Sequence, residues 1–286
     1  VVPGARRRVG LIILTVLSLL ITIAALTLAW ANTRAGRGDR RGAMRLAAVL
    51  LALYMTDWLL GADHVADAGE RALVVQALGA GLVFSAAVYV LYLALEPHVR
   101  RHWPEVLVGW SRAIAGRLRD PIVGREVLVG VLLGTATWAI GTTVNRLTGV
   151  VSTNKILDAV ISLRRVAALF LGGWGAATFF AVALCFVLLL IRAIVRRDAL
   201  VVLSAVTLAT LLIGLIARSG LNIAGVVSVA AFSLAASVAV TRFGLIAFVA
   251  LIFTGSFSSI APSSLDQSAW YSGVGDFTIA AIIAIA

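Results

Sequence analysis

Asp57 and Arg146 carry the charges that are hardest to explain in this chain. Asp57 falls inside the apolar run 44–61, and Arg146 closes the apolar run 127–144. An ionisable side chain in a bilayer is costly, so it normally faces a charged partner or a water path. Both residues are expected near the same membrane surface, which makes an Asp57–Arg146 pair a candidate. The alternative is that Asp57 simply lies near the outer interface. Such a pair either lines a polar pathway or serves helix packing.

A second group of residues has side chains that bind metals in other proteins, but their local sequence disfavours a metal site. His98 and His102 are four residues apart, with Glu96 and Glu105 beside them. A metal site needs three or four ligands that are held in place by further hydrogen bonds. Prolines at 97 and 104 interrupt the regular helix that would put both histidines on one face. We therefore predict no metal and no cofactor.

The chain has none of the local motifs that mark common membrane enzymes. It contains neither the HExxH zinc motif nor the GxSxG nucleophile motif. The sequence therefore predicts no catalytic residue, and whether the protein takes part in an enzyme stays open.

The elements that position these residues are predicted to be membrane helices. Of the 286 residues, 61% are hydrophobic and only 13% are charged, against about 25% charged in a typical soluble domain. Long apolar runs recur along the chain, and no stretch alternates as the strands of a membrane β-barrel do. We predict one all-α domain over 1–286, a polytopic helical bundle. The excess of basic residues, a net charge of +11, is expected to meet anionic lipid headgroups rather than nucleic acid.

Eight apolar runs are long enough to cross a membrane, and a ninth is cut off by the end of the chain. The predicted spans cover residues 9–31, 44–61, 72–95, 127–144, 166–191, 199–217, 221–240, 243–260 and the truncated 277–286. The chain begins with Val and ends inside an apolar run, so we expect a fragment at both ends. Within the fourth span, "GVLLG" (130–134) has the spacing of small residues that allows close helix approach, although it is weak grounds for a dimer. The oligomeric state is left open.

The distribution of basic residues predicts which side of the membrane each loop occupies, because cytoplasmic loops are enriched in Lys and Arg. If residue 1 lies outside, fifteen of the 24 Lys and Arg residues are cytoplasmic and nine are not. The cytoplasmic residues would be Arg34, Arg37, Arg40, Arg41, Arg45, Arg100, Arg101, Arg112, Arg117, Arg119, Arg125, Arg192, Arg196, Arg197 and Arg242. We therefore predict an extracytoplasmic residue 1.

The segment between the third and fourth spans is predicted to form an amphipathic helix over about 104–119. Pro104 suits a first helical turn, and Asp120–Pro121 ends the helix. One face would carry Trp103, Val106, Leu107, Trp110, Ile114 and Leu118. Arg101, Arg112 and Arg119 lie largely off that face. Such a helix is expected to lie parallel to the membrane, with tryptophans at headgroup depth, and to offer a surface to a cytoplasmic partner.

Four segments resemble a known family. They are "GRGDRRGAMRLA" (36–47), "LYLALEPHVRRHWPEVLVGWSRAIAGRLRDPIVGREVLVG" (91–130), "TRFGLIA" (241–247) and "SAWYSG" (268–273). These resemble the C-terminal membrane block of acidobacterial-type serine/threonine protein kinases. In that family a cytoplasmic kinase domain precedes one span, an extracytoplasmic region and then this block.

The resemblance implies a bacterial inner-membrane protein with residue 1 outside, in agreement with the arginine count. It also implies that any kinase activity lies upstream of residue 1, because the chain has no Gly-rich phosphate loop with its lysine strand, no "HRD" and no "DFG". The implied function is a non-catalytic domain that anchors the kinase and relays a signal to it. The alternative is a small-molecule transporter or channel, since an anchor needs only one span.

Overall fold

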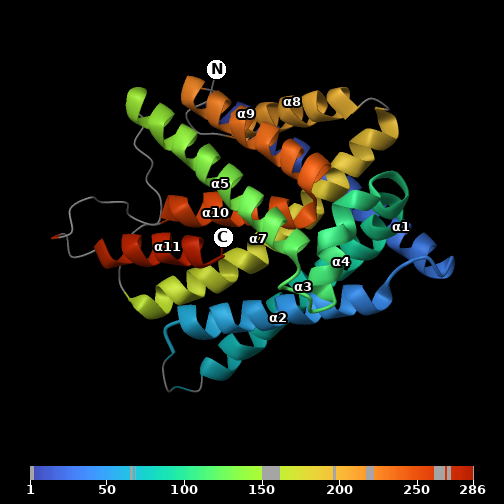
Figure 1. Cartoon of the computed structure of the whole chain (residues 1–286), viewed down its shortest axis with the longest axis horizontal. Coiled ribbons are helices and arrows are strands. Elements are labelled where there is room, and N and C mark those ends of the chain that lie inside the picture. Colours follow the sequence, from blue (N-terminus) through green and yellow to red (C-terminus); the bar gives the residue numbers. More distant parts are fainter. Residues whose placement is uncertain are drawn as a thin grey trace.

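The chain folds as a bundle of helices, shown in Figure 1. The computed structural model describes residues 3–64, 67, 69–149, 162–195, 198–216, 222–260, 268 and 272–285. Every regular element within these ranges is helical, so the prediction of an all-α domain is confirmed. The elements are α1 (Pro3–Arg34), α2 (Arg40–Gly61), α3 (Glu70–His102), the 3₁₀ turn η1 (Pro104–Leu107), α4 (Val108–Ile114), α5 (Pro121–Leu147), α7 (Leu163–Ile194), α8 (Asp198–Ile216), α9 (Ile223–Val238), the π-helical turn η2 (Ala239–Phe243), α10 (Leu245–Ile260) and α11 (Ser272–Ile285).

In the described part of the chain, six helices are long and apolar enough to cross a membrane. They are Arg8–Arg34, Arg40–Gly61, Glu70–Arg101, Pro121–Leu147, Arg164–Ile194 and Ile223–Phe243. Each contains or overlaps one predicted span, which supports a polytopic membrane protein. The predicted spans 199–217, 243–260 and 277–286 correspond to α8, α10 and α11, whose described apolar stretches are shorter. Residues 217, 221 and 286 of the predicted spans lie outside the described residues.

The centre of the bundle is α10, which packs on α5 and α7. Phe248, Leu251 and Phe253 of α10 are almost completely buried, and so are small residues on its other faces, such as Ala247 and Ala250. A helix that is apolar all round is stable only when it is enclosed. Because other helices surround it, α10 can be shorter than a helix that must match the lipid thickness.

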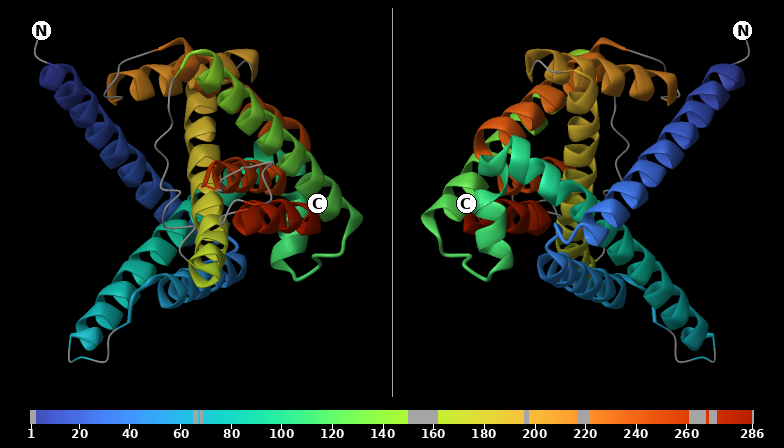
Figure 2. Two further views of the ribbon diagram at one scale, coloured as in Figure 1. Left: turned by 90° about the vertical axis from the view of Figure 1, so that its left-hand side faces the viewer. Right: turned by 90° about the vertical axis from the view of Figure 1, so that its right-hand side faces the viewer.

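The outer helices present their apolar side chains outward. α1 is the extreme case: its N-terminal half projects from the rest of the molecule in Figure 2, and Ile12, Leu19 and Trp30 are exposed. Apolar surface on this scale is stable in lipid rather than water. In the part of α1 whose burial is described, the buried residues are Gly10, Ala25, Ala29 and the polar Asn32.

The approach of α5 to α10 depends on two glycines. A methyl group added at Gly130 would lie 2.3 Å from the backbone oxygen of Ala247, and one added at Gly134 would lie 2.7 Å from that of Leu251. Both distances are too short for real contacts, so the backbones can meet only because these residues lack a side chain. The "GVLLG" pattern therefore forms a contact within the chain, and α5 and α10 run in parallel.

The predicted helix over 104–119 is shorter than expected. η1 and α4 end at Ile114, because Gly116 adopts a positive φ of 84° and the Arg117 N–H donates to the Arg112 oxygen at 2.9 Å. This hydrogen bond is characteristic of a Schellman motif, which terminates a helix. The predicted helix over 104–119 was therefore too long, since one glycine outweighs the apolar periodicity of the sequence.

The apolar face of η1 and α4 points into the protein. Val106, Leu107 and Trp110 are each less than 9% exposed and belong to the main hydrophobic core. Trp110 therefore does not face lipid, because neighbouring helices cover the apolar face that lipid was expected to cover. Leu118, the last residue of the predicted face, is 68% exposed in the turn after α4.

We predict that Gly130→Ala destabilises the bundle. The added methyl group must push α10 away from α5, and overpacking of this kind typically costs about 1–3 kcal/mol. The measurement is the thermal unfolding midpoint of the purified chain in detergent micelles.

The matched control is Gly124→Ala in the same helix, where an added methyl group meets nothing within 4 Å. Replacing an open helical glycine with alanine should stabilise the chain by up to about 1 kcal/mol. Equal midpoints for the two variants would contradict the close contact between α5 and α10.

Candidate functional site

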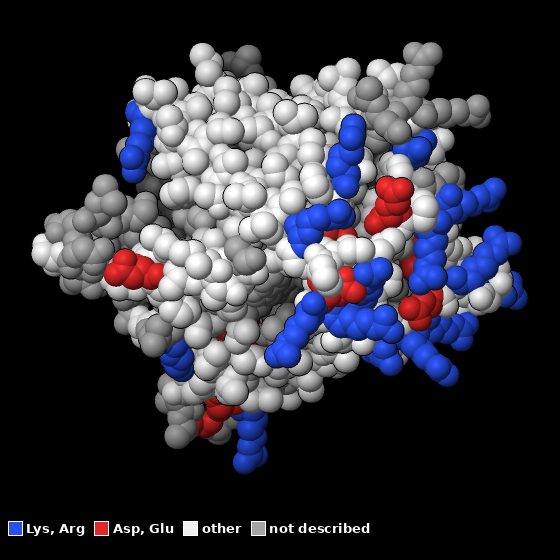
Figure 3. Space-filling model, in the orientation of Figure 1, with Lys and Arg blue, Asp and Glu red and all other residues white. Residues whose placement is uncertain are grey.

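Basic side chains gather at one end of the bundle, which we call the arginine-rich end. It is formed by the C-terminal ends of α1, α3 and α7, the start of α2 and α5, the α4 region and η2. Its described members are Arg34, Arg37, Arg40, Arg41, Arg45, Arg100, Arg101, Arg112, Arg117, Arg119, Arg125, Arg192 and Arg242. Figure 3 shows many blue side chains on the right of the molecule and few elsewhere on that face. The opposite end has Arg71, Arg146, Arg164 and Arg165, and the first turns of α1 contain Arg6, Arg7 and Arg8. Arg196 and Arg197 lie outside the described residues.

Buried polar contacts hold the arginine-rich end together. The Asn32 side chain at the end of α1 donates to the backbone oxygens of Leu93 and Ala94 in α3, at 2.9 and 3.3 Å. The Asp39 N–H, just before α2, donates to the Glu96 carboxylate at 3.2 Å. The first contact lies inside α3, where Pro97 has no N–H to donate to the Leu93 oxygen. The second satisfies the backbone N–H of the residue that caps α2.

The predicted surface residues of the 101–119 segment have different environments. Trp103 is partly buried, with the Arg192 guanidinium 4.4 Å from the centre of its ring, and Trp110 is buried. Arg112 forms an ion pair with Asp120 through hydrogen bonds of 2.6 and 2.8 Å. Arg101 and Arg119 are exposed. The exposed side chains of this segment thus include arginines, whereas Trp110 is buried and Trp103 is partly covered.

The Arg112–Asp120 pair marks the start of α5. Asp120 caps this helix by accepting from the Ile122 N–H at 3.0 Å, and Pro121 occupies the first turn. The hydrogen bond from Arg112, together with that from Ile122, lowers the pKa of the Asp120 carboxyl group below its ordinary value. The carboxylate therefore stays charged and keeps the turn after α4 attached to α5.

The structure does not bring Asp57 and Arg146 into an ion pair. Asp57 is half-buried in α2 and faces α7, where a methyl group added at Gly172 would lie 2.7 Å from the carboxyl carbon. Arg146 is exposed at the C-terminal end of α5. Among the described residues neither forms a salt bridge. Asp57 instead occupies space that exists because Gly172 has no side chain.

The most unusual ionisable residue is Glu126, which the sequence analysis did not select. It lies in the second turn of α5 and is 1% exposed, and its Oε2 has no hydrogen-bond partner among the described residues. Next to Arg125, it looked like the polar margin of a span that was placed at 127–144. The signal that could have found it is a single acid on the side of α5 that also carries Gly130 and Gly134, four and eight residues later.

Two glycines make room for the Glu126 carboxylate. A methyl group at Gly109 in α4 would lie 2.4 Å from both carboxylate oxygens, and one at Gly244 would lie 3.0 Å from Oε2. Gly244 also has a φ of 115°, a conformation that residues with a side chain rarely adopt. The backbone N–H groups of Gly109 and Ile246 are directed at the carboxyl group. Glu126 therefore joins α5, α4 and the start of α10.

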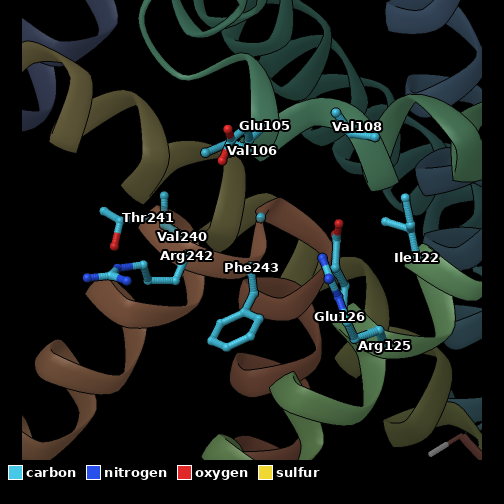
Figure 4. A pocket seen from close by; sticks show the side chains of 11 residues that line it. Glu105, Val106, Val108, Ile122, Arg125, Glu126, Val240, Thr241, Arg242 and Phe243 are labelled. Carbon is cyan, nitrogen blue, oxygen red and sulfur yellow. The ribbon is translucent and has the colours of Figure 1, made fainter.

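A cavity of about 210 Å³ opens beside Glu126. Figure 4 shows Glu126 and Arg125 on one side of it, with Thr241 and Arg242 on the other. Glu105 and several valines complete the wall. The cavity thus combines apolar walls with two acidic and two basic side chains. A small ligand with charged groups suits such a lining.

The described residues contain no group of three His, Cys, Asp or Glu that could hold a metal ion. His98 contacts the Ala94 backbone oxygen within its own helix, at 3.2 Å.

Comparison with known proteins found no matching family model, no matching curated protein and no matching solved structure. The structural features that bear on function are therefore the arginine-rich end and the cavity.

We predict that Gly109→Ala destabilises the chain through Glu126. The new methyl group must displace the buried carboxylate, at a cost of about 1–3 kcal/mol. In a Glu126→Ala background the same substitution should cost less than about 0.5 kcal/mol, because the atoms that it would contact are gone. Unfolding midpoints of the four proteins of this cycle measure the coupling. Additive effects would show that Gly109 and Glu126 do not interact.

Proposed function

We propose that this chain is the non-catalytic membrane domain of a serine/threonine protein kinase, which it anchors and to which it relays a signal. The proposal rests on the contacts among the segments that resemble the kinase family. Three of the four, 36–47, 91–130 and 241–247, come together at the arginine-rich end, through Asp39 and Glu96 on one side and Gly244 and Glu126 on the other. A surface assembled from distant segments is a suitable contact for a cytoplasmic domain.

The proposed orientation places the arginine-rich end in the cytoplasm of a bacterial cell. Arginine is concentrated at the cytoplasmic ends of membrane helices. With this end inside, α1 runs inward and residue 1 lies outside the inner membrane. Anionic headgroups would then neutralise the arginines that no carboxylate contacts.

We further propose that α8 and α10 also cross the membrane, for at least eight crossings. α7 ends at the arginine-rich end with Arg192, and so does η2 with Arg242. Between them α9 begins near the opposite end, since Ser228 lies 3.5 Å from the position of a methyl group at Gly141, late in α5. The chain must therefore return across the bundle between α7 and α9, and α8 is the helix available. Its 19 residues span about 28 Å, close to the hydrocarbon thickness.

The proposed topology predicts which engineered cysteines react from outside intact cells. Asp67→Cys should be labelled by a membrane-impermeant maleimide, and Arg37→Cys only after the cells are opened. The native Cys185 is buried, so it should not interfere. Labelling of residue 37 but not of residue 67 in intact cells would reverse the topology.

The kinase proposal predicts that the coding sequence upstream of Val1 contains a kinase domain with "HRD" and "DFG" motifs. In the full protein, Arg117→Glu combined with Arg119→Glu should lower autophosphorylation several-fold, because both side chains are exposed at the arginine-rich end. Arg71→Glu at the opposite end is the matched control and should leave autophosphorylation unchanged. A start codon a few residues before Val1 would contradict the proposal.

A transporter or channel is the second candidate. Its support is the number of helices, which exceeds what an anchor needs, and a buried carboxylate next to a cavity. Polar groups of this kind within membrane proteins commonly belong to substrate or ion pathways.

A further inference from the structure

The Glu126 cavity has the features of a binding site, independently of the kinase proposal. Glu126 is 99% buried, it lines the cavity, and its Oε2 has no hydrogen-bond donor among the described residues. A buried acceptor without a donor is unfavourable, because it has lost its hydrogen bonds with water. A ligand that brings a donor to Oε2 would remove this penalty.

The donor that fits best is a primary ammonium group. A carboxylate repels anions, and a bare metal ion would find too few ligands, because no metal-binding group of three residues exists in the part of the chain that is described. An ammonium group carries one positive charge and three N–H donors, so it can form a charge-assisted hydrogen bond with Oε2.

The same cavity also calls for a negative charge on the ligand. Arg125 and Arg242 line it, and a simple cation would be repelled by these two side chains. Guanidinium groups bind phosphate and carboxylate oxygens well. A ligand with an ammonium group at one end and an anionic group at the other complements both kinds of side chain.

The size and position of the cavity limit the ligand further. Its volume of about 210 Å³ is below the 300 Å³ or more of typical ligand pockets, so only a small group fits. Val106, Val108 and Phe243 form apolar walls. Arg125 and Arg242 lie near the ends of two membrane-crossing helices, Pro121–Leu147 and Ile223–Phe243, which is the depth of lipid headgroups.

We propose that this cavity binds a phosphoethanolamine group, with the ammonium on Glu126 and the phosphate toward Arg125 and Arg242. Two sources share this chemistry. One is the headgroup of phosphatidylethanolamine from the surrounding leaflet, and the other is a soluble aminoalkyl phosphate from the aqueous side.

The test is isothermal titration of the detergent-purified chain with O-phosphorylethanolamine, phosphocholine and inorganic phosphate. We expect phosphocholine and phosphate to bind at least tenfold more weakly, because neither donates an N–H to Oε2. Glu126→Gln should weaken O-phosphorylethanolamine binding at least tenfold. The matched control is Glu70→Gln, which removes a carboxylate that contacts His64 at the other end of the bundle and should change affinity less than twofold.

A second variant protects the test if Glu126→Gln fails to fold. Val108→Trp keeps the carboxylate but fills the cavity, since Val108 is a partly exposed wall residue, and it should also abolish binding. Unchanged affinity in either folded variant would overturn the proposal, as would equal binding of the three ligands or no binding of O-phosphorylethanolamine.

Native mass spectrometry separates the two sources. If the ligand is a lipid, chains released from nanodiscs of mixed phosphatidylethanolamine and phosphatidylcholine should retain phosphatidylethanolamine. The Glu126→Gln variant should then retain both lipids equally. Binding of O-phosphorylethanolamine in the titration, without retention of phosphatidylethanolamine in the mass spectra, would support the soluble source.

Discussion

The contact between α5 and α10 is the constraint on which the rest of the structure depends. Two helices can bring their backbones together only where side chains are absent, and Gly130 and Gly134 supply that surface one turn apart. Because α10 is held against α5, its first residues come to lie beside Glu126. The same contact encloses α10, so that a helix of only 16 residues can form the centre of a membrane bundle.

Charged side chains and outward-facing apolar side chains occupy different parts of the molecule. Along the helices, apolar side chains such as Ile12 and Leu19 of α1 face outward, as expected where the solvent is lipid. At the arginine-rich end, polar side chains replace them and satisfy backbone groups, as Asn32 does beside Pro97 in α3 and Asp120 at the start of α5. Under the proposed topology, this separation orients the bundle in the membrane.

The position of Glu126 bears on both the packing of the helices and the proposed ligand site. Its carboxylate lies among backbone N–H groups of α4 and α10, which helps to join these helices to α5. One oxygen nevertheless remains without a donor and borders a cavity. A group that held helices together and nothing more would be expected to have all its hydrogen bonds made within the protein. The unused oxygen is therefore what points to a ligand, and a ligand there would couple the positions of α4, α5 and α10.

The amino-acid sequence by itself determined the class of the fold and the positions of most helices, because the length and hydrophobicity of each run depend on neighbouring residues only. The break at Asp120–Pro121, where α5 begins, was likewise predicted from local chemistry. Only the tertiary structure decided that Trp110 is buried in protein, that α4 ends at Gly116, that Asp57 faces Gly172 and that Glu126 meets Gly109 and Gly244. In a membrane protein the same apolar face can contact lipid or another helix, and hydrophobic periodicity does not distinguish the two. Which surface covers it depends on contacts between residues far apart in the chain.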